Sequence, residues 1–246
     1  MKTLILILAG CLMLPGLSSG APPVDNTIWA KLLQKHVTDK GVDYDGFKQD
    51  EAKLDQYLAI LSSIDPVALP YNHQFAFYIN TYNAFTIKLI LTRYPGINSI
   101  KEISSFFSNP WSKKFIPLNG FTVNLDHIEH DILRPRFKDA RVHFAINCAA
   151  RSCPPLLNVP YEGSTLETQL DNQTKKFINN PANTFLKDNT LFVSRIFKWF
   201  ADDFSGSPLR FIRQHAQGRL RQDLEKAGSG NEITLQYLYY DWTLNR

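Results

Sequence analysis

The chain has 246 residues and a formal net charge of +4. This length is enough for one large domain with a sizeable core. The mild charge is spread along the chain without a long block of one sign, which excludes an obvious nucleic-acid surface. We therefore expect no nucleic-acid partner.

The first 20 residues have the pattern of a secretory signal. Lys2 forms the positive end, residues 4–14 form an apolar core, and residues 18–20 are small. The apolar run is interrupted short of the roughly 20 residues that a membrane helix needs. We expect cleavage after Gly20 and a periplasmic or secreted protein.

The sequence Leu-Ala-Gly-Cys at residues 8–11 gives an alternative for this segment, because it matches the pattern read by lipoprotein processing. Only ten residues precede Cys11, which would make the apolar core unusually short. A lipid anchor on Cys11 is the one route by which we expect membrane association.

Periodic apolar residues predict a series of helices along the remaining chain. The 72–93 segment is apolar nearly all round, so we expect it to be the buried central helix of the fold. The predicted helices span residues 26–37, 51–63, 72–93, 125–134, 164–180, 208–215 and 219–227.

Alternating residues and turn signals predict the strands. Asn119-Gly120 between two alternating runs is typical of a two-residue hairpin over 115–124, and a second hairpin is expected over 184–194. Further strands are expected over 141–147 and 233–242. We predict a single α+β domain over 22–246, with an antiparallel, hairpin-linked sheet packed on the central helix. The residues expected in its core are Trp29, Phe77, Ile79, Phe85, Leu89, Ile128, Val142, Phe144 and Trp199.

The stretch RVHFAINCAARSCPPL at residues 141–156 is the most informative segment of the chain. It places His143 on a predicted strand, followed by Cys148 and Cys153 in a loop of small residues. A neighbouring imidazole lowers the pKa of a thiol from about 8.5 toward neutrality and creates a nucleophile. We therefore expect Cys148 to be the nucleophile and His143 its general base. The alternatives are a small buried thiol at Cys148 and a hydrogen-bonded core histidine at His143.

Glu129 lies on the apolar face of the helix predicted over 125–134. A buried carboxylate is costly unless it has a partner. We expect Glu129 to orient the site histidine, and pairing with Arg134 or Arg141 is the structural alternative.

Several other side chains are secondary candidates for the site. Cys153 fits a resolving or disulfide role as well as it fits a nucleophile. Asn80 and Asn83 share a face of the central helix, where their buried amides must be hydrogen-bonded, either as clamps on loop backbone or as site donors. His130 and Arg151 complete this group. His127 and His130 have a spacing that can bind a metal, but no third ligand is placed by the sequence, so we assign no metal ligand and no cofactor.

Several motifs of this sequence resemble those of the family called domain of unknown function 547. The resemblance runs in order from Trp29 to Arg246, and the motifs that carry it are Phe77–Ala84, Leu125–Arg134, Val142–Leu156, Trp199–Phe204 and Tyr240–Trp242. It implies a papain-like or transglutaminase-like arrangement of helix and sheet. In plant members of the family the position of Cys153 is often serine, which favours Cys148 as the characteristic thiol.

Three classes of function follow from these residues. The first is a cysteine-dependent hydrolase or acyl transferase that acts on an amide or thioester of a small molecule or peptide. The second is a non-catalytic binding module in which Cys148 and Cys153 form a structural disulfide. The third is a dithiol redox protein, against which the four residues between the cysteines count, because a thioredoxin-type motif has two.

Overall fold

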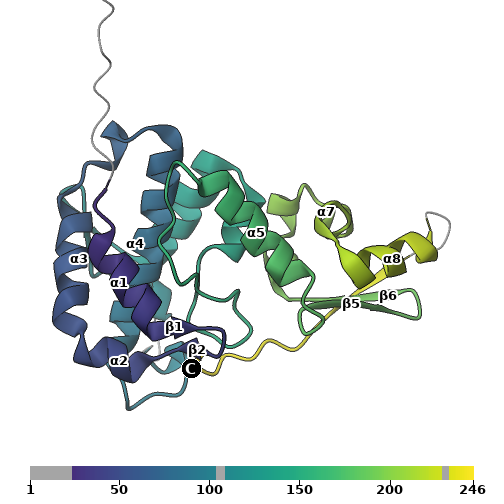
Figure 1. The fold of residues 1–246 in the computed structure, drawn as a ribbon, viewed down its shortest axis with the longest axis horizontal. Coiled ribbons are helices and arrows are strands. Elements are labelled where there is room, and N and C mark those ends of the chain that lie inside the picture. The colour runs from purple at the N-terminus through teal and green to yellow at the C-terminus, as the bar shows by residue number, and fades with distance from the viewer. Residues whose placement is uncertain (1–23, 104–108, 229–232) are drawn as a thin grey trace, which may run out of the picture.

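The longest helix, α4 (Tyr71–Leu91), lies at the centre of one half of the molecule. The structure is a computed structural model that describes residues 24–103, 109–228 and 233–246. The expected signal segment therefore lies outside the described residues. Figure 1 shows α1–α4 grouped at one end, a small sheet with α7 and α8 at the other, and α5 between them.

The helices follow the predicted periodicity closely, because each one buries an apolar stripe. Two of them, α3 and α7, match their predicted bounds, and α2 is an addition, in which the Asp43 carboxylate accepts a hydrogen bond from the Gly46 N–H at 2.8 Å. The α-helices are α1 (Thr27–His36), α2 (Tyr44–Gln49), α3 (Glu51–Ser63), α4 (Tyr71–Leu91), α5 (Leu166–Ile178), α6 (Ile196–Trp199), α7 (Pro208–His215) and α8 (Gly218–Ala227).

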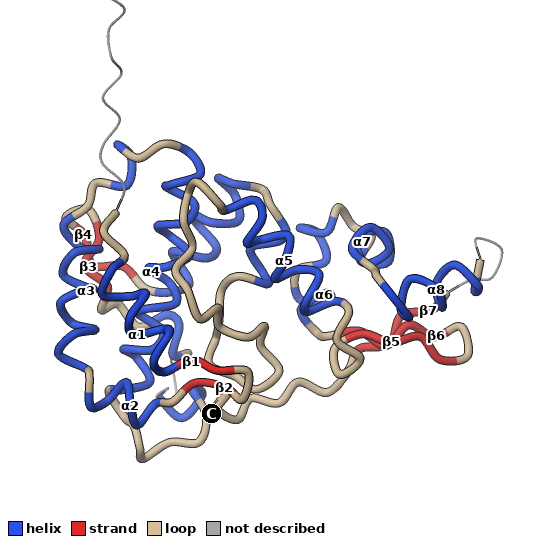
Figure 2. Tube along the Cα trace, viewed as in Figure 1, coloured by secondary structure: helices blue, strands red, loops and turns tan. Residues whose placement is uncertain are grey.

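Within the described ranges, the strands form three small separate sheets among the helices (Figure 2). Both predicted hairpins are present, one as β3 with β4 and the other as β5 with β6. The strands are β1 (Val37–Thr38), β2 (Gly41–Val42), β3 (Ile116–Leu118), β4 (Phe121–Val123), β5 (Thr184–Lys187), β6 (Thr190–Val193) and β7 (Thr234–Tyr237).

The sheet differs from the prediction in two respects. Its third strand, β7, is shorter than the predicted 233–242 segment and runs parallel to β6. The three-stranded sheet also packs with α5, α7 and α8 rather than on the central helix, since its buried residues belong to a second hydrophobic cluster. The fold is still a single α+β domain.

Two hydrophobic clusters form the core, and the segment 142–150 contributes to both. Val142 and Ala145 belong to the cluster around α4, whereas Phe144 and Ala150 belong to the cluster around the three-stranded sheet. Of the predicted core residues, only Trp199 is wrong, with 43% of its surface exposed. It lies at the end of the four-residue helix α6, where one side of its ring faces the open cavity described below.

The segment that contains His143 is a 3-10 helix, Ala140–Phe144, and not the predicted strand. The Asp139 carboxylate accepts a hydrogen bond from the Arg141 N–H at 2.9 Å and so opens a helical turn. Val142, His143 and Phe144 are all buried. When both faces of a segment are buried, alternation of residue types no longer identifies a strand.

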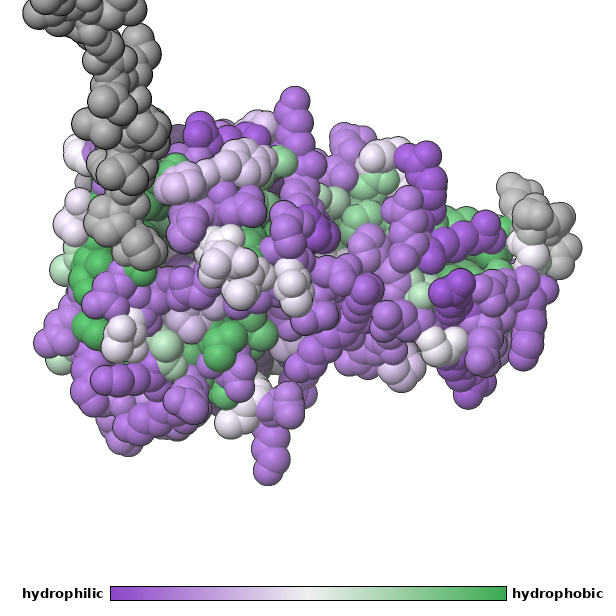
Figure 3. Space-filling view, turned by 45° about the horizontal axis from the view of Figure 1, so that its top comes forward, coloured by the Kyte–Doolittle hydropathy of each residue, from purple (hydrophilic) through white to green (hydrophobic). Residues whose placement is uncertain are grey.

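The predicted 125–134 helix begins at residue 125 as expected, with one α-helical step at residues 125–126, and continues through Pro135 as a π-helix, His127–Phe137. Such helices are rare and are found frequently at functional sites. None of the helices in the described ranges combines the length and apolar character needed to span a bilayer. The face in Figure 3 is mostly hydrophilic, with small scattered hydrophobic patches.

Candidate functional site

A cavity of about 200 Å³ lies beside the segment that joins the two clusters. It contains Cys148, His143 and Glu129, together with the secondary candidates Cys153 and His130. Its lining residues are Tyr82, Trp111, Asp126, Glu129, His130, His143, Ile146, Cys148, Cys153, Pro154, Ile196, Trp199, Phe200, Tyr240 and Trp242.

The loop that carries Cys148 is held in an unusual backbone conformation. Ala149 has a φ of 63°, in the left-handed region that residues other than glycine seldom adopt. The Asn147 side chain supports this turn, because its Oδ1 accepts the Ala149 N–H at 2.9 Å and its Nδ2 donates to the Pro154 carbonyl at 2.7 Å. Backbone strain of this kind clusters at functional sites.

The C-terminal tail forms backbone hydrogen bonds with the same loop. The Arg151 N–H donates to the Thr243 carbonyl at 2.8 Å, and the Asn245 N–H donates to the Ala149 carbonyl at 3.1 Å. Figure 1 shows this tail returning from the sheet toward α2. The position of the thiol therefore depends on the last residues of the chain.

The Cys148 sulfur contacts two hydrogen-bonding groups. Its Sγ lies 2.9 Å from the Sγ of Cys153 and 3.3 Å from the hydroxyl of Tyr240, and both cysteines are free thiols. Hydrogen bonding by Cys153 and then by Tyr240 lowers the pKa of Cys148 despite its burial. Burial raises the pKa of Cys153 well above its ordinary value, so Cys148 is the thiol that ionises first.

His143 is buried and pairs with a carboxylate that the sequence analysis did not identify. Its Nε2 lies 2.7 Å from Oδ2 of Asp203, and its ring stacks on Phe200 with 3.9 Å between centroids. Burial would raise the pKa of Asp203, but hydrogen bonds from His143 and Arg134 lower it below its usual range. An ionised Asp203 only accepts hydrogen bonds, so Nε2 carries the ring proton and Nδ1 keeps a lone pair.

Arg134 completes this network from the π-helix. It donates from Nε and Nη2 to the two oxygens of Asp203, at 2.6 and 3.1 Å. Its Nη1 lies 3.0 Å from Nδ1 of His130. Because a guanidinium only donates, Nδ1 of His130 is occupied as an acceptor, which makes His130 a weaker candidate for the general base than His143.

Glu129 does not orient His143, and it forms neither of the arginine pairs considered as alternatives. Arg134 pairs with Asp203, and Arg141 pairs with Asp139 and Glu167. Burial raises the pKa of Glu129 to about 7, against the lowering effect of a hydrogen bond with Tyr82. The group is therefore a carboxylic acid that can be neutral near physiological pH, facing the cavity.

The two asparagines of α4 act as backbone clamps and lie outside the cavity lining. Asn83 accepts the Asn147 N–H at 2.8 Å and donates to the Ala145 carbonyl at 3.0 Å. Asn80 makes the same pair of bonds with the backbone of Tyr161, at 3.0 and 2.8 Å. Arg151 also lies outside the lining and is exposed.

Aromatic side chains form one wall of the cavity. Trp242 contacts Trp111, Trp199 and Tyr240, with ring centroids 5.7, 5.7 and 4.6 Å apart. Trp199 and Tyr240 also contact each other at 4.8 Å. This set of four rings is called the aromatic wall below.

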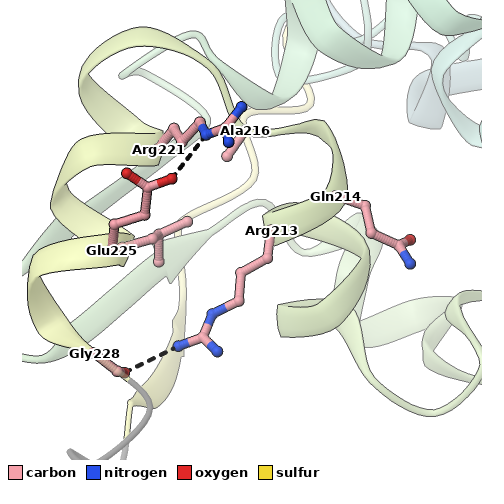
Figure 4. Close-up of a pocket in the computed structure, with 7 residues that line it drawn as sticks. Arg213, Gln214, Ala216, Arg221, Glu225 and Gly228 are labelled. Carbon is pink, nitrogen blue, oxygen red and sulfur yellow. Dashed lines mark hydrogen bonds and ion pairs between the residues drawn. The ribbon is translucent and has the colours of Figure 1, made fainter.

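A second hollow, of about 400 Å³, lies between α7 and α8 (Figure 4). Its charged groups are already paired, because Arg221 donates to Glu225 at 2.8 Å and Arg213 donates to the Gly228 carbonyl at 3.4 Å. These contacts are structural, and we assign no chemistry to this hollow.

Asp203 and Tyr240 are the functional candidates that sequence reasoning missed. Both lie inside motifs that carried the family resemblance, Trp199–Phe204 and Tyr240–Trp242, so a signal existed. It did not connect them to the thiol, since Asp203 is 60 residues from His143 and Tyr240 is 92 residues from Cys148.

Of the comparisons with known proteins, one gives a match, and it covers the central part of the chain. No curated protein and no solved structure matches the chain. Residues 66–178 match a family model described as "Protein of unknown function, DUF547". This segment contains Glu129, His143, Cys148 and Cys153. Residues 66–178 therefore belong to the family of domains of unknown function 547.

Proposed function

We propose that the cavity is the active site of a cysteine-dependent hydrolase or acyl transferase that acts on an amide or thioester. The observation that carries this proposal is a thiol of lowered pKa in the same small cavity as a histidine–aspartate pair. Cys148 is the nucleophile, His143 the general base, and Asp203 the group that orients the imidazole. The roles are those of a cysteine–histidine–carboxylate triad.

The proposed reaction proceeds in two steps. The Cys148 sulfur attacks the acyl carbon and the thiol proton passes to Nδ1 of His143. The bond to the leaving amine or thiol then breaks, the leaving group takes that proton, and the acyl group remains on sulfur. Water or another acceptor then attacks the thioester carbon and gives its proton to His143. The carbon–sulfur bond breaks, the acyl group leaves on the acceptor (as the acid when water is the acceptor), and the sulfur takes the proton back from His143.

Two donors beside the sulfur are proposed to stabilise the oxyanion that forms during attack. The hydroxyl of Tyr240 lies 3.3 Å from the Cys148 sulfur, and the Ala150 N–H contributes a backbone hydrogen bond at the same sulfur. Donors fixed beside a reacting carbonyl act where negative charge develops. Glu129, when neutral, is a third group able to donate.

Acyl transfer from p-nitrophenyl acetate tests the proposal. We expect one acetyl group on Cys148, found by intact-mass analysis and peptide mapping after a short incubation. Cys148→Ala should remove the adduct, and the matched control Cys153→Ala should keep it. An adduct that persists in Cys148→Ala, or none in the native protein, would overturn the proposal.

A second candidate, a dithiol redox protein, is favoured by the 2.9 Å contact between the two sulfurs. Cys148 would attack a disulfide substrate and release one thiol, and Cys153 would then displace the second thiol and leave a Cys148–Cys153 disulfide. Oxidised glutathione distinguishes the two candidates. A redox protein should accumulate the internal disulfide, and Cys153→Ser should trap a mixed disulfide on Cys148.

We also propose export of the protein through the segment 1–20. Intact-mass analysis of protein from its native host should find a chain that begins at Ala21. A diacylglycerol on Cys11 would instead indicate the lipoprotein form, and a mass that retains Met1 would exclude both.

A further inference from the structure

The side chains around Cys148 also restrict which acyl group can reach it. We infer that the cavity holds the acyl part of the substrate as a small, uncharged, apolar group of about one aromatic ring. This inference rests on the proposed function and adds the substrate class to it. Three features of the cavity support it: its wall, its charges and its size.

The aromatic wall provides the binding surface. Trp111, Trp199, Tyr240 and Trp242 come from three separate parts of the chain and contact one another at 4.6–5.7 Å. Ile146, Pro154, Ile196 and Phe200 provide the other apolar surfaces. Aromatic groups pack on such rings in stacked or edge-on geometry with a gain of about 0.5–1.5 kcal/mol for each pair.

The polar groups of the cavity do not suit a charged acyl group. Asp203 is bound by His143 and Arg134, and Glu129 interacts with Tyr82. A carboxylate in the acyl group would lose its hydration and would approach Asp126, which lines the cavity. Among the described residues that surround the cavity, Arg134 is the only arginine in contact with these groups. Its guanidinium already donates two hydrogen bonds to Asp203.

The size of the cavity limits the length of the acyl chain. A volume of about 200 Å³ is below the usual range for sites of drug-sized ligands, roughly 300–1,000 Å³. An apolar protein cavity of about 150 Å³ is enough to bind benzene. One ring with a short link to the carbonyl therefore fits, and a long fatty acyl chain does not.

The leaving group has a separate path. A larger hollow of about 970 Å³ adjoins the cavity, and the two share Asp126 and His130. It is lined by polar side chains such as Asn124, His127 and Asp131. A polar leaving group can therefore extend away from the sulfur while the apolar acyl group stays on the aromatic wall.

Acylation rates with a series of p-nitrophenyl esters test this assignment. We expect phenylacetyl to acylate Cys148 at least about 10-fold faster than octanoyl or succinyl, a ratio within the range that pocket fit gives. Trp199→Ala should reduce that ratio about 10-fold, because it removes one ring of the aromatic wall. The matched control is Tyr239→Ala, because Tyr239 is 83% exposed and lies outside the lining.

Two outcomes would overturn the inference and leave the proposed function intact: octanoyl or succinyl reacting as fast as phenylacetyl, or a ratio that Trp199→Ala does not change. Binding of phenylacetamide to Cys148→Ser, measured by quenching of tryptophan fluorescence, does not depend on turnover. Quenching that Trp199→Ala weakens supports the pocket even if no acyl-enzyme forms. Absence of saturable quenching overturns it.

Discussion

The family segment 66–178 and the chain that follows it contribute different parts of the same cavity. The first supplies the imidazole of His143, on a 3-10 helix, and the thiol of Cys148, beside the strained residue Ala149. The second supplies most of the aromatic wall, and also Asp203, which pairs with the imidazole from outside the cavity lining. Neither region alone holds Cys148, His143 and Asp203.

This division shows that the family segment is the centre of the chemistry but not the whole of it. The last residues of the chain bond to the backbone around Ala149 and Arg151 and bring Tyr240 to the Cys148 sulfur. A protein cut after residue 178 would keep the nucleophile and lose its surroundings. Variants in the family segment and in the chain that follows it can therefore show how much each region contributes to the reactivity of Cys148.

The largest effect is expected from Asp203→Asn. Arg134 should hold the amide oxygen, which turns the NH₂ group toward His143 and makes Nε2 an acceptor. The ring proton then moves to Nδ1, and the base is lost. We expect acylation of Cys148 to slow on the order of 10²- to 10⁴-fold, measured by the p-nitrophenolate burst.

The control for this variant is the adjacent carboxylate. Asp202 is exposed, so Asp202→Asn should leave the burst rate within about 2-fold, as is usual for changes at exposed sites. If Asp203→Asn reacts at the native rate, the carboxylate from the C-terminal region has no part in the chemistry.

Much of the scaffold was predictable because its signals are local. The helices α3 and α7 follow from their apolar period and the hairpin β3–β4 from an Asn-Gly turn, and each signal is contained within about a dozen residues. The conformation of the 141–147 segment was not predictable in this way. Burial on every side removes the alternation of apolar and polar residues that separates a strand from a 3-10 helix.

The site was predictable only in part, for a related reason. Cys148, His143 and Glu129 do line one cavity, as their spacing and residue types indicated. Their partners were assigned wrongly, since His143 pairs with Asp203 and Glu129 with Tyr82. Both partnerships join segments far apart in the chain, and pairing across such distances depends on packing that no local pattern records.

Asn83→Ala tests the contribution of α4 to the thiol loop. The change leaves the Asn147 N–H and the Ala145 carbonyl without their buried partner. We expect a loss of about 2–4 kcal/mol in the free energy of unfolding, measured by urea denaturation. Asn80→Ala removes a similar pair at Tyr161, so it should cost as much stability while changing the alkylation rate of Cys148 less. Equal effects on alkylation would contradict a local role for Asn83.

Glu129→Gln should change how stability depends on pH. Burial raises the pKa of Glu129 to about 7, so between its unfolded value, about 4.3, and pH 7 the folded state binds more protons than the unfolded state. Stability of the native protein therefore falls as pH rises through this window. We expect the free energy of unfolding of the variant, relative to that of the native protein, to increase by up to roughly 3 kcal/mol between pH 4 and pH 8. Glu167→Gln, at an exposed carboxylate, is the control and should show little gain.

The smallest effect is expected from Tyr240→Phe, which changes the thiol without removing it. The Tyr240 hydroxyl and Cys153 together lower the pKa of Cys148, so removal of the hydroxyl should raise the pH midpoint of its alkylation by iodoacetamide. His143→Ala should move that midpoint less, because the hydrogen bonds at the sulfur come from Cys153 and Tyr240 rather than from the imidazole. From the sequence alone, His143 is predicted to lower the pKa of Cys148, and no such effect is assigned to Tyr240. If His143→Ala gives the larger shift, the imidazole and not the C-terminal tyrosine controls the thiol, and activation would lie wholly within the family segment.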